Sequence, residues 1–179
     1  MTEKEEHALI LDYLPYGYPM GKRMSPIAQA IGVKTFALLE LVPRRGVSLA
    51  QRENVYIGPE KRDKIYYIAG RLSRDKLTET AKLQLQEFIE SVVAEREKEF
   101  VEFFNNAQPM NTRLHQIELL PGFGHKHTEE VLKARKEKAF LSFSDIKSRV
   151  KSIPDPKKAV EKRILEELSE RQRFNLFVK

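Results

Sequence analysis

The residues of this chain that are best suited to chemistry lie in one short segment, 120–126, which reads LPGFGHK. Glycines permit a positive φ or the close approach of another molecule, and proline fixes φ at the start of a turn. The apolar pair Val131 and Leu132 follows at a spacing that favours a helix beginning near Gly124. Because the first amide N–H groups of a helix have no partner within it, they bind anions. The segment therefore predicts an oxyanion site made largely of backbone.

The order apolar, Pro, Gly, apolar, Gly, any residue, Lys resembles the helix-hairpin-helix motif, which grips nucleic-acid backbones without reading bases. In that family the hairpin amides and a nearby lysine hold a phosphate, and hairpin carbonyls sometimes hold a monovalent cation. The residues expected at the site are Gly122, Phe123, Gly124, His125, Lys126, Lys133 and Arg135. Among them, Phe123 is expected to insert into the core, and Lys133 and Arg135 are the cations on the next helical turns. One position departs from the motif, because Thr128 stands where Ala is usual, and this bears on how closely the two helices pack.

Two other interpretations fit the hairpin residues. A turn of this kind also joins two packed helices without any ligand. Motifs of this kind also serve as protein-docking modules, and the partner would then be a ribosome- or transcription-related protein. The resemblance alone does not choose among these interpretations.

Catalysis and metal binding find little support in the sequence. Some relatives of the hairpin motif are base-excision enzymes with a Lys or Asp after the hairpin, but Asp145 falls in the helix-capping pattern 142–145, SFSD. His125 and His127 diverge by about 200° on a helix, and the chain has no cysteine to complete a metal site. We find no carboxylate pair, nucleophile-base pair or nucleotide phosphate loop. The expectation is a protein that is not an enzyme and has no metal or cofactor.

Composition favours a polyanionic partner. The formal net charge is +6 and the sequence pI is about 9.4. Residues 21–76 carry twelve basic and five acidic side chains, residues 77–107 are net acidic, and residues 121–151 are net basic. The absence of cysteine excludes disulfides and favours a reducing compartment. No apolar run reaches bilayer length, and the N-terminal segment MTEKEE is charged and lacks an apolar signal core, so we expect a cytoplasmic protein with no membrane contact.

The first part of the chain has the pattern of a small β-barrel. Short apolar runs separated by turn signals predict about five strands, at residues 8–13, 26–33, 34–42, 54–57 and 65–68. Such strands suit a closed or nearly closed barrel of the oligonucleotide-binding (OB) type. Most basic residues of this part fall between strands, and we expect a second nucleic-acid contact at Arg44, Arg45, Lys61 and Arg62.

All six tyrosines of the chain also lie in this first part. Basic loops beside exposed aromatic rings suit single-stranded nucleic acid, because the cations meet phosphates and the rings stack on bases. Alternatively, Tyr56, Tyr66 and Tyr67 are ordinary strand residues that are half-buried in a core.

The rest of the chain is predicted to be helical. Asp75 or Thr78 can cap a helix that runs to about Asn105 with an apolar stripe on one side, forming a connecting strut about 40 Å long. After the glycine hairpin, a second helix-turn-helix follows, but its turn at 153–159 has two prolines and no glycine, so we expect it to be structural. The expected class is α+β, with an OB-like barrel at 1–75, a long connecting helix at 76–107 and a tandem helix-hairpin-helix domain at 108–179.

Over nearly its full length the chain resembles an archaeal family of uncharacterised proteins, domain of unknown function 655. That resemblance implies a barrel-like N-terminal part, a tandem helix-hairpin-helix C-terminal part, and RNA rather than DNA as the ligand. Together with the motif and the charge, it predicts nucleic-acid binding without sequence specificity.

Overall fold

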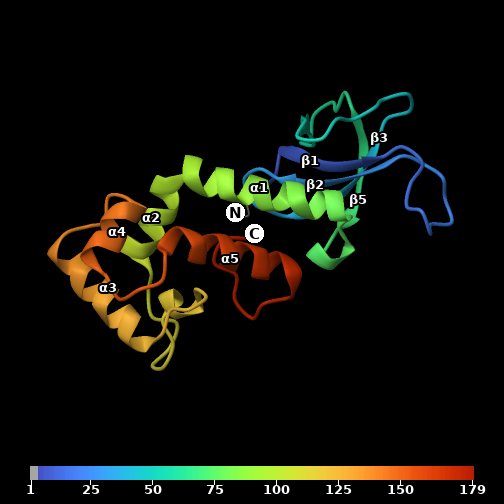
Figure 1. Ribbon diagram of the computed structural model, residues 1–179. Coiled ribbons are helices and arrows are strands. Elements are labelled where there is room, and N and C mark those ends of the chain that lie inside the picture. Colours follow the sequence, from blue (N-terminus) through green and yellow to red (C-terminus); the bar gives the residue numbers. More distant parts are fainter. Residues whose placement is uncertain (1–3) are drawn as a thin grey trace. The chain divides into compact units, whose positions relative to one another are not determined.

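Figure 1 shows the computed structural model of the protein, which describes residues 4–179. Contacts divide the chain into two units, of which the first combines residues 4–87 with Glu167–Lys179 and the second is Phe88–Glu166. The division falls inside helices α1 (Glu79–Glu95) and α5 (Pro156–Ser169). These divisions differ from the expected boundaries near 75 and 107, because the first part of α1, the end of α5 and the C-terminal residues all belong to the first unit.

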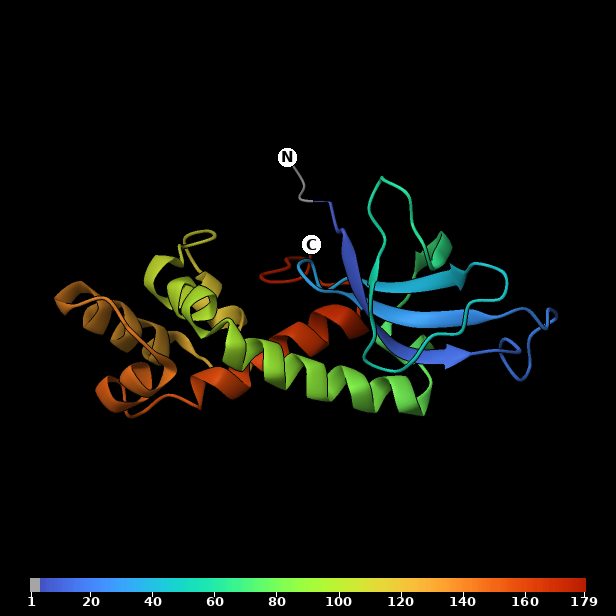
Figure 2. The same ribbon diagram turned by 90° about the horizontal axis from the view of Figure 1, so that it is seen from above.

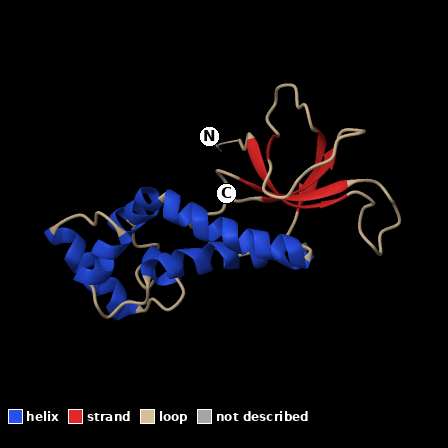
Figure 3. Ribbon diagram, turned by 45° about the horizontal axis from the view of Figure 1, so that its top comes forward, coloured by secondary structure: helices blue, strands red, loops and turns tan. Residues whose placement is uncertain are grey.

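The first unit contains a single curled sheet of five antiparallel strands (Figure 3). In the order β4-β1-β2-β3-β5, its strands are β1 (His7–Leu14), β2 (Ile27–Gly32), β3 (Leu38–Pro43), β4 (Asn54–Tyr56) and β5 (Ile65–Arg71). All five predicted strands form. The sheet is a half-barrel rather than a closed barrel, because within the described chain β4 and β5 are its two edges and do not pair with each other. The loop after β4, teal in Figure 2, projects away from the strands.

Alternate residues of the strands build the core inside the curl of the sheet. Side chains on a strand point to opposite faces in turn, so residues two apart share a face. The buried cluster consists of Ala8, Ile10, Ala28, Ala30, Ala37, Leu39, Leu41, Leu49, Val55, Ile57 and Ile65. On the other face, the buried Gln29 accepts the Thr78 N–H and donates to the Lys76 carbonyl. Thr78 Oγ1 accepts from Ala81 N at 3.1 Å, so Thr78 is the residue that caps α1.

The predicted long helix is two helices. The α1 helix ends at Glu95, and α2 (Glu97–Asn106) follows after Arg96, whose φ of −102° and ψ of 30° are not helical. The remaining helical elements are the 3-10 turns η1 (Arg74–Lys76) and η2 (Gln116–Leu119) and the helices α3 (His125–Glu137), α4 (Phe143–Arg149) and α5. No helix within residues 4–179 has the length and apolar character needed to cross a bilayer.

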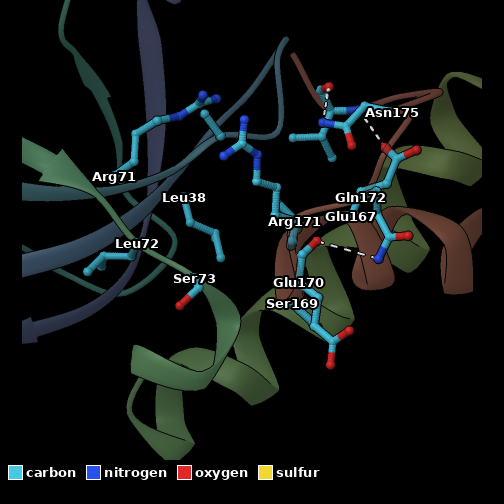
Figure 4. Close-up of a pocket in the computed structure, with 13 residues that line it drawn as sticks. Leu38, Arg71, Leu72, Ser73, Glu167, Ser169, Glu170, Arg171, Gln172 and Asn175 are labelled. Carbon is cyan, nitrogen blue, oxygen red and sulfur yellow. Dashed lines mark hydrogen bonds between the residues drawn. The ribbon is translucent and has the colours of Figure 1, made fainter.

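The C-terminal segment, for which the sequence suggested no role, returns to the sheet. The buried carboxylate of Glu167 accepts the backbone N–H groups of Leu176, Phe177 and Val178. Val178 is buried, and Lys179 N donates to the Thr35 carbonyl at 3.0 Å. Figure 4 shows the cleft of about 320 Å³ that this segment forms with residues of β3, β5 and the loop after β5. A single carboxylate thus holds the C-terminal segment through three N–H groups.

Candidate nucleic-acid interface

The predicted turn between two helical elements forms, although a 3-10 turn stands where a first helix was expected. The η2 turn ends at Leu119, the chain turns through Pro121 and Gly122, and α3 begins at His125. Phe123 is only 5% exposed, and its ring centroid lies 6.1 Å from that of Phe104. The predicted insertion of Phe123 into the core is confirmed. Burial also removes its side chain from any interface, so its place among the binding residues is corrected to a structural one.

Gly122 is required by the fold. Its φ is +84°, in the left-handed region that side chains rarely adopt. A Cβ at this position would lie 3.1 Å from Cγ of Pro154, in the turn of the second hairpin. The glycine therefore lets the first hairpin approach the second, which fits the structural role predicted for the second turn.

Gly124 is not required by the fold. Its φ of −103° and ψ of −173° are extended values that any residue adopts. A Cβ there would meet one atom within 4 Å, Nδ1 of His127 at 4.0 Å, which is ordinary contact. Ser, Thr, Asn or Asp would cap a helix at least as well as Gly. The missing side chain leaves an open approach to the first turn of α3.

Three backbone amides in the first turn of α3 are available to donate hydrogen bonds to a ligand. Within the described chain, the N–H groups of His125, Lys126 and His127 have no hydrogen-bond partner. The Gly124 N–H, predicted to contact phosphate, instead donates to His127 Nδ1 at 3.0 Å, so it is already occupied. The His127 amide, which the sequence reasoning did not name, is uncovered instead, as the number of unpaired amides at a helix start implies. Acceptance at Nδ1 requires that nitrogen of His127 to be unprotonated.

Thr128 resolves the departure from the motif. It is buried, and both its backbone N–H and its hydroxyl donate to the Gly124 carbonyl, at 3.1 Å and 3.0 Å. The hydroxyl therefore has a partner inside the hairpin, and the residue fits the place where Ala is usual. These two bonds leave the Gly124 carbonyl directed into α3, and the amides of the next three residues remain uncovered.

Charges of both signs surround the amides. Lys126 is exposed and has no carboxylate partner within residues 4–179. The exposed His125 ring lies between two carboxylates, with Nδ1 3.6 Å from Glu118 Oε1 and Nε2 3.2 Å from Glu129 Oε1. Lys133 is exposed further along α3. The two acids oppose anion binding at His125, so Lys126 and the amides must supply the attraction.

Arg135 supports the hairpin from within, contrary to its predicted role as a flanking contact. It is half-buried, and its Nη1 donates to the carbonyls of Phe104 and Ala107 at 3.1 Å and 2.9 Å. Burial, and next the positive charge of Arg135, hold the pKa of His115 below its usual value. A neutral His115 suits its position, because its Nδ1 accepts the Ile117 N–H at the start of η2.

The cations predicted between strands divide into two kinds. Arg44 Nε donates to the Arg62 carbonyl at 2.6 Å, and Arg62 Nε donates to the Gly58 carbonyl at 2.8 Å, so the structure brings these two arginines together. Arg45 and Lys61 are exposed. These four residues belong to the first unit, whereas the hairpin belongs to the second. The two candidate contacts therefore belong to different units.

Asp145, considered for catalysis, caps a helix as the sequence indicated. Ser142 Oγ accepts the Asp145 N–H at 2.9 Å, and the Asp145 carboxylate accepts the Leu141 N–H at 3.0 Å. That backbone hydrogen bond, with a smaller contribution from Arg149, lowers the pKa of Asp145. A carboxylate held ionised by these partners is a poor proton acceptor. Its contacts are those of a capping residue.

Comparison with known proteins identifies relatives but no activity. A family described as "Protein of unknown function (DUF655)" matches residues 4–179. An uncharacterised protein of Methanocaldococcus jannaschii, MJ0038, is 41% identical over 177 residues, covering 98% of this chain and 80% of that protein. The crystal structure of Af1531 from Archaeoglobus fulgidus, also described by DUF655, is 40% identical, with a TM-score of 0.84 over 98% of this chain and 100% of that chain.

Proposed function

Because the chain belongs to the DUF655 family, whose description gives no function, we propose from the hairpin geometry that it binds nucleic-acid backbones without reading base sequence. RNA is the favoured ligand, since unpaired bases are the usual targets on RNA and exposed tyrosines suit them. The hairpin of the second unit supplies one contact. The basic loops of the first unit supply another.

The observation that carries this proposal is the glycine at position 124. Neither its φ nor the space around it needs glycine, and other residues would cap α3 as well. Because the fold does not require glycine at position 124, we attribute the missing side chain to a molecule that approaches the backbone there. The three uncovered amides beside it support an oxyanion as that molecule, because unpaired N–H groups at a helix start bind anions.

A phosphate at the start of α3 would accept hydrogen bonds from the amides of His125, Lys126 and His127. The dipole of this helix, with 13 residues, adds partial positive charge at the same end. The Lys126 ammonium would pair with a second phosphate oxygen. All of these groups contact the sugar-phosphate backbone and none reads a base edge, so binding would not depend on sequence.

The salt dependence of binding tests the proposal. We expect the logarithm of the affinity for a single-stranded RNA to fall linearly with the logarithm of salt concentration, by about 0.7 per neutralised phosphate. Lys126→Gln should make that slope shallower by about one phosphate contact. The matched control is Lys98→Gln, which removes an exposed lysine from the acidic helix α2. A flat response of affinity to salt would contradict nucleic-acid binding by charge.

A second candidate function is docking to a ribosome- or transcription-related protein through the hairpin. The observation that favours it is the pair of carboxylates, Glu118 and Glu129, that flank His125. Such acids weaken the attraction of phosphates and would strengthen that of a basic protein surface.

The substitution Glu129→Gln separates the two functions by the sign of its effect. Glu129 is exposed, and its loss removes a negative charge close to the proposed phosphate. We expect affinity for RNA to rise by a few fold at low salt, with less effect at high salt, because exposed charges are screened. The docking function would be favoured if Glu129→Gln lowered the affinity for RNA. It would also be favoured if the variant bound a captured basic protein less tightly while its affinity for RNA was unchanged. Fluorescence anisotropy at two salt concentrations measures both.

A further inference from the structure

The edge strand β5 leaves two aromatic rings in solvent. Tyr66 is 64% exposed and Tyr67 is 46% exposed, so neither belongs to the core that strand tyrosines usually join. Every residue of β5 after Ile65 is exposed. Two adjacent exposed aromatic rings at a strand edge offer flat surfaces on which a partner can pack.

A β-bulge places the two rings together. Val42 of β3 pairs with Tyr67 and Pro43 pairs with Ile65, so Tyr66 is an extra residue in β5. Consecutive side chains of a regular strand point to opposite faces, and a bulge breaks that alternation. The ring centroids of Tyr66 and Tyr67 lie 5.4 Å apart at an interplanar angle of 74°. The sequence pattern of the strand does not predict this pairing, because it depends on the register with β3.

Cations lie at both ends of the strand. At its start, Arg44 N donates to the Lys64 carbonyl at 2.8 Å, which brings these two basic residues beside Ile65. At its end is Arg71, whose guanidinium donates to the Lys179 carbonyl. The acids Glu60 and Asp63 belong to the preceding loop, and Glu53 is paired with Lys64. Arg44, Arg45, Lys61, Arg62, Lys64 and Arg71 outnumber these three acids.

We propose that Tyr66 and Tyr67 form a stacking platform for unpaired bases of single-stranded RNA, with the flanking cations holding its phosphates. This inference rests on the proposed function and adds a second site that sets the preference for single strands. Aromatic rings stack on any base, so the platform would remain independent of sequence. Bases inside a duplex are already stacked on each other and cannot reach it.

The bulges favour nucleic acid over a peptide as the occupant. A second extra residue, Ala69, interrupts the register between Gly70 and Ile68. Two interruptions within seven residues twist the edge away from the straight ladder that an added peptide strand needs. Two tilted rings between cations, by contrast, need no regular backbone from their ligand.

The test compares a single-stranded oligouridine with an RNA duplex by fluorescence anisotropy. We expect Tyr66→Leu and Tyr67→Leu each to lower affinity for the single strand by about tenfold, because leucine is apolar but offers no ring for stacking. The corresponding phenylalanine variants should retain most of the affinity. Affinity for the duplex should change less than twofold in all of them. Leu83→Ala, which trims another exposed apolar side chain of the first unit, is the control and should have no effect.

The same titrations with Gly124→Ala separate this inference from the proposed function. Loss of affinity in the leucine variants alone would support the platform and contradict the hairpin contact. Loss in Gly124→Ala alone, with full single-strand affinity in the double variant Tyr66→Leu/Tyr67→Leu, would overturn the platform. Equal losses for single strand and duplex in the leucine variants would also overturn it, because stacking on unpaired bases cannot act on a duplex. Failure of the unmodified protein to bind either RNA would overturn both proposals.

Discussion

Gly124→Val is expected to lower RNA affinity by at least about a hundredfold while leaving the protein folded. The added side chain would occupy the open space beside the uncovered amides of His125–His127 and keep a phosphate from hydrogen-bonding distance. Loss of charge-assisted hydrogen bonds to a bound anion is worth roughly 1.5–3 kcal/mol each, so losing two accounts for the effect. Stability should fall by only about 1 kcal/mol, since valine is a poorer helix cap than glycine. Anisotropy titrations and thermal unfolding measure the two quantities.

Gly122→Ala provides the contrasting control. It would strain a φ of +84° and bring a methyl group to 3.1 Å from Pro154, so we expect lower stability. Gly124→Ala adds a methyl group at an unstrained φ, so we expect it to cost no more than about 1 kcal/mol of stability, as for valine, and still to weaken binding. If both Gly124 variants bind RNA as tightly as the unmodified protein, the hairpin is not the contact.

Glu167→Ala is expected to lower the free energy of unfolding by about 2–4 kcal/mol. Its carboxylate is buried and accepts three backbone N–H groups of the C-terminal segment. Removing the carboxylate leaves these three N–H groups without an acceptor, and each unpaired N–H group lowers the free energy of unfolding by about 1 kcal/mol or more. The segment should also become sensitive to limited proteolysis, because these bonds hold it against the sheet. Urea unfolding and a protease time course measure the change.

The matched control is Glu170→Ala, three residues later. Glu170 lines the same cleft but is exposed, and its hydrogen bond is made through its backbone carbonyl to Gln172. We expect its stability to stay within about 0.5 kcal/mol of the unmodified protein. Equal effects of the two substitutions would mean that Glu167 does not anchor the segment.

Local patterns predicted the elements well. Apolar runs bounded by turn residues marked all five strands, and Ser142 and Thr78 cap helices where the sequence indicated. The positive φ of Gly122 and the burial of Phe123 followed from the hairpin pattern alone. These features depend on neighbouring residues, which is the information that a sequence displays most directly.

Features set by distant contacts were missed. The half-barrel depends on whether β4 and β5 meet, and the return of the C-terminal segment depends on Glu167 finding amides nine to eleven residues later. The break at Arg96 has no proline or glycine to announce it. The helical spacing of apolar residues continues across that break, so the sequence pattern indicated one helix where two form.

The candidate site was predicted in outline and corrected in detail. The amides of His125 and Lys126 have no hydrogen-bond partner within the described chain, but the Gly124 amide is held by His127. Arg135 was expected to flank the site from a later turn of the same helix, yet its guanidinium donates to two backbone carbonyls. Side-chain partners of this kind depend on packing, which spacing does not reveal.

Backbone NMR offers the most direct measurement of the central claim that the start of α3 holds a phosphate. During titration with single-stranded RNA, we predict that the amide resonances of His125, Lys126 and His127 shift together and saturate at the binding affinity, with proton shifts to lower field as hydrogen bonds to oxygen form. The amide of Gly124, already bonded to His127, should move less. Saturable binding during which the amides of 125–127 keep their free positions would contradict the claim.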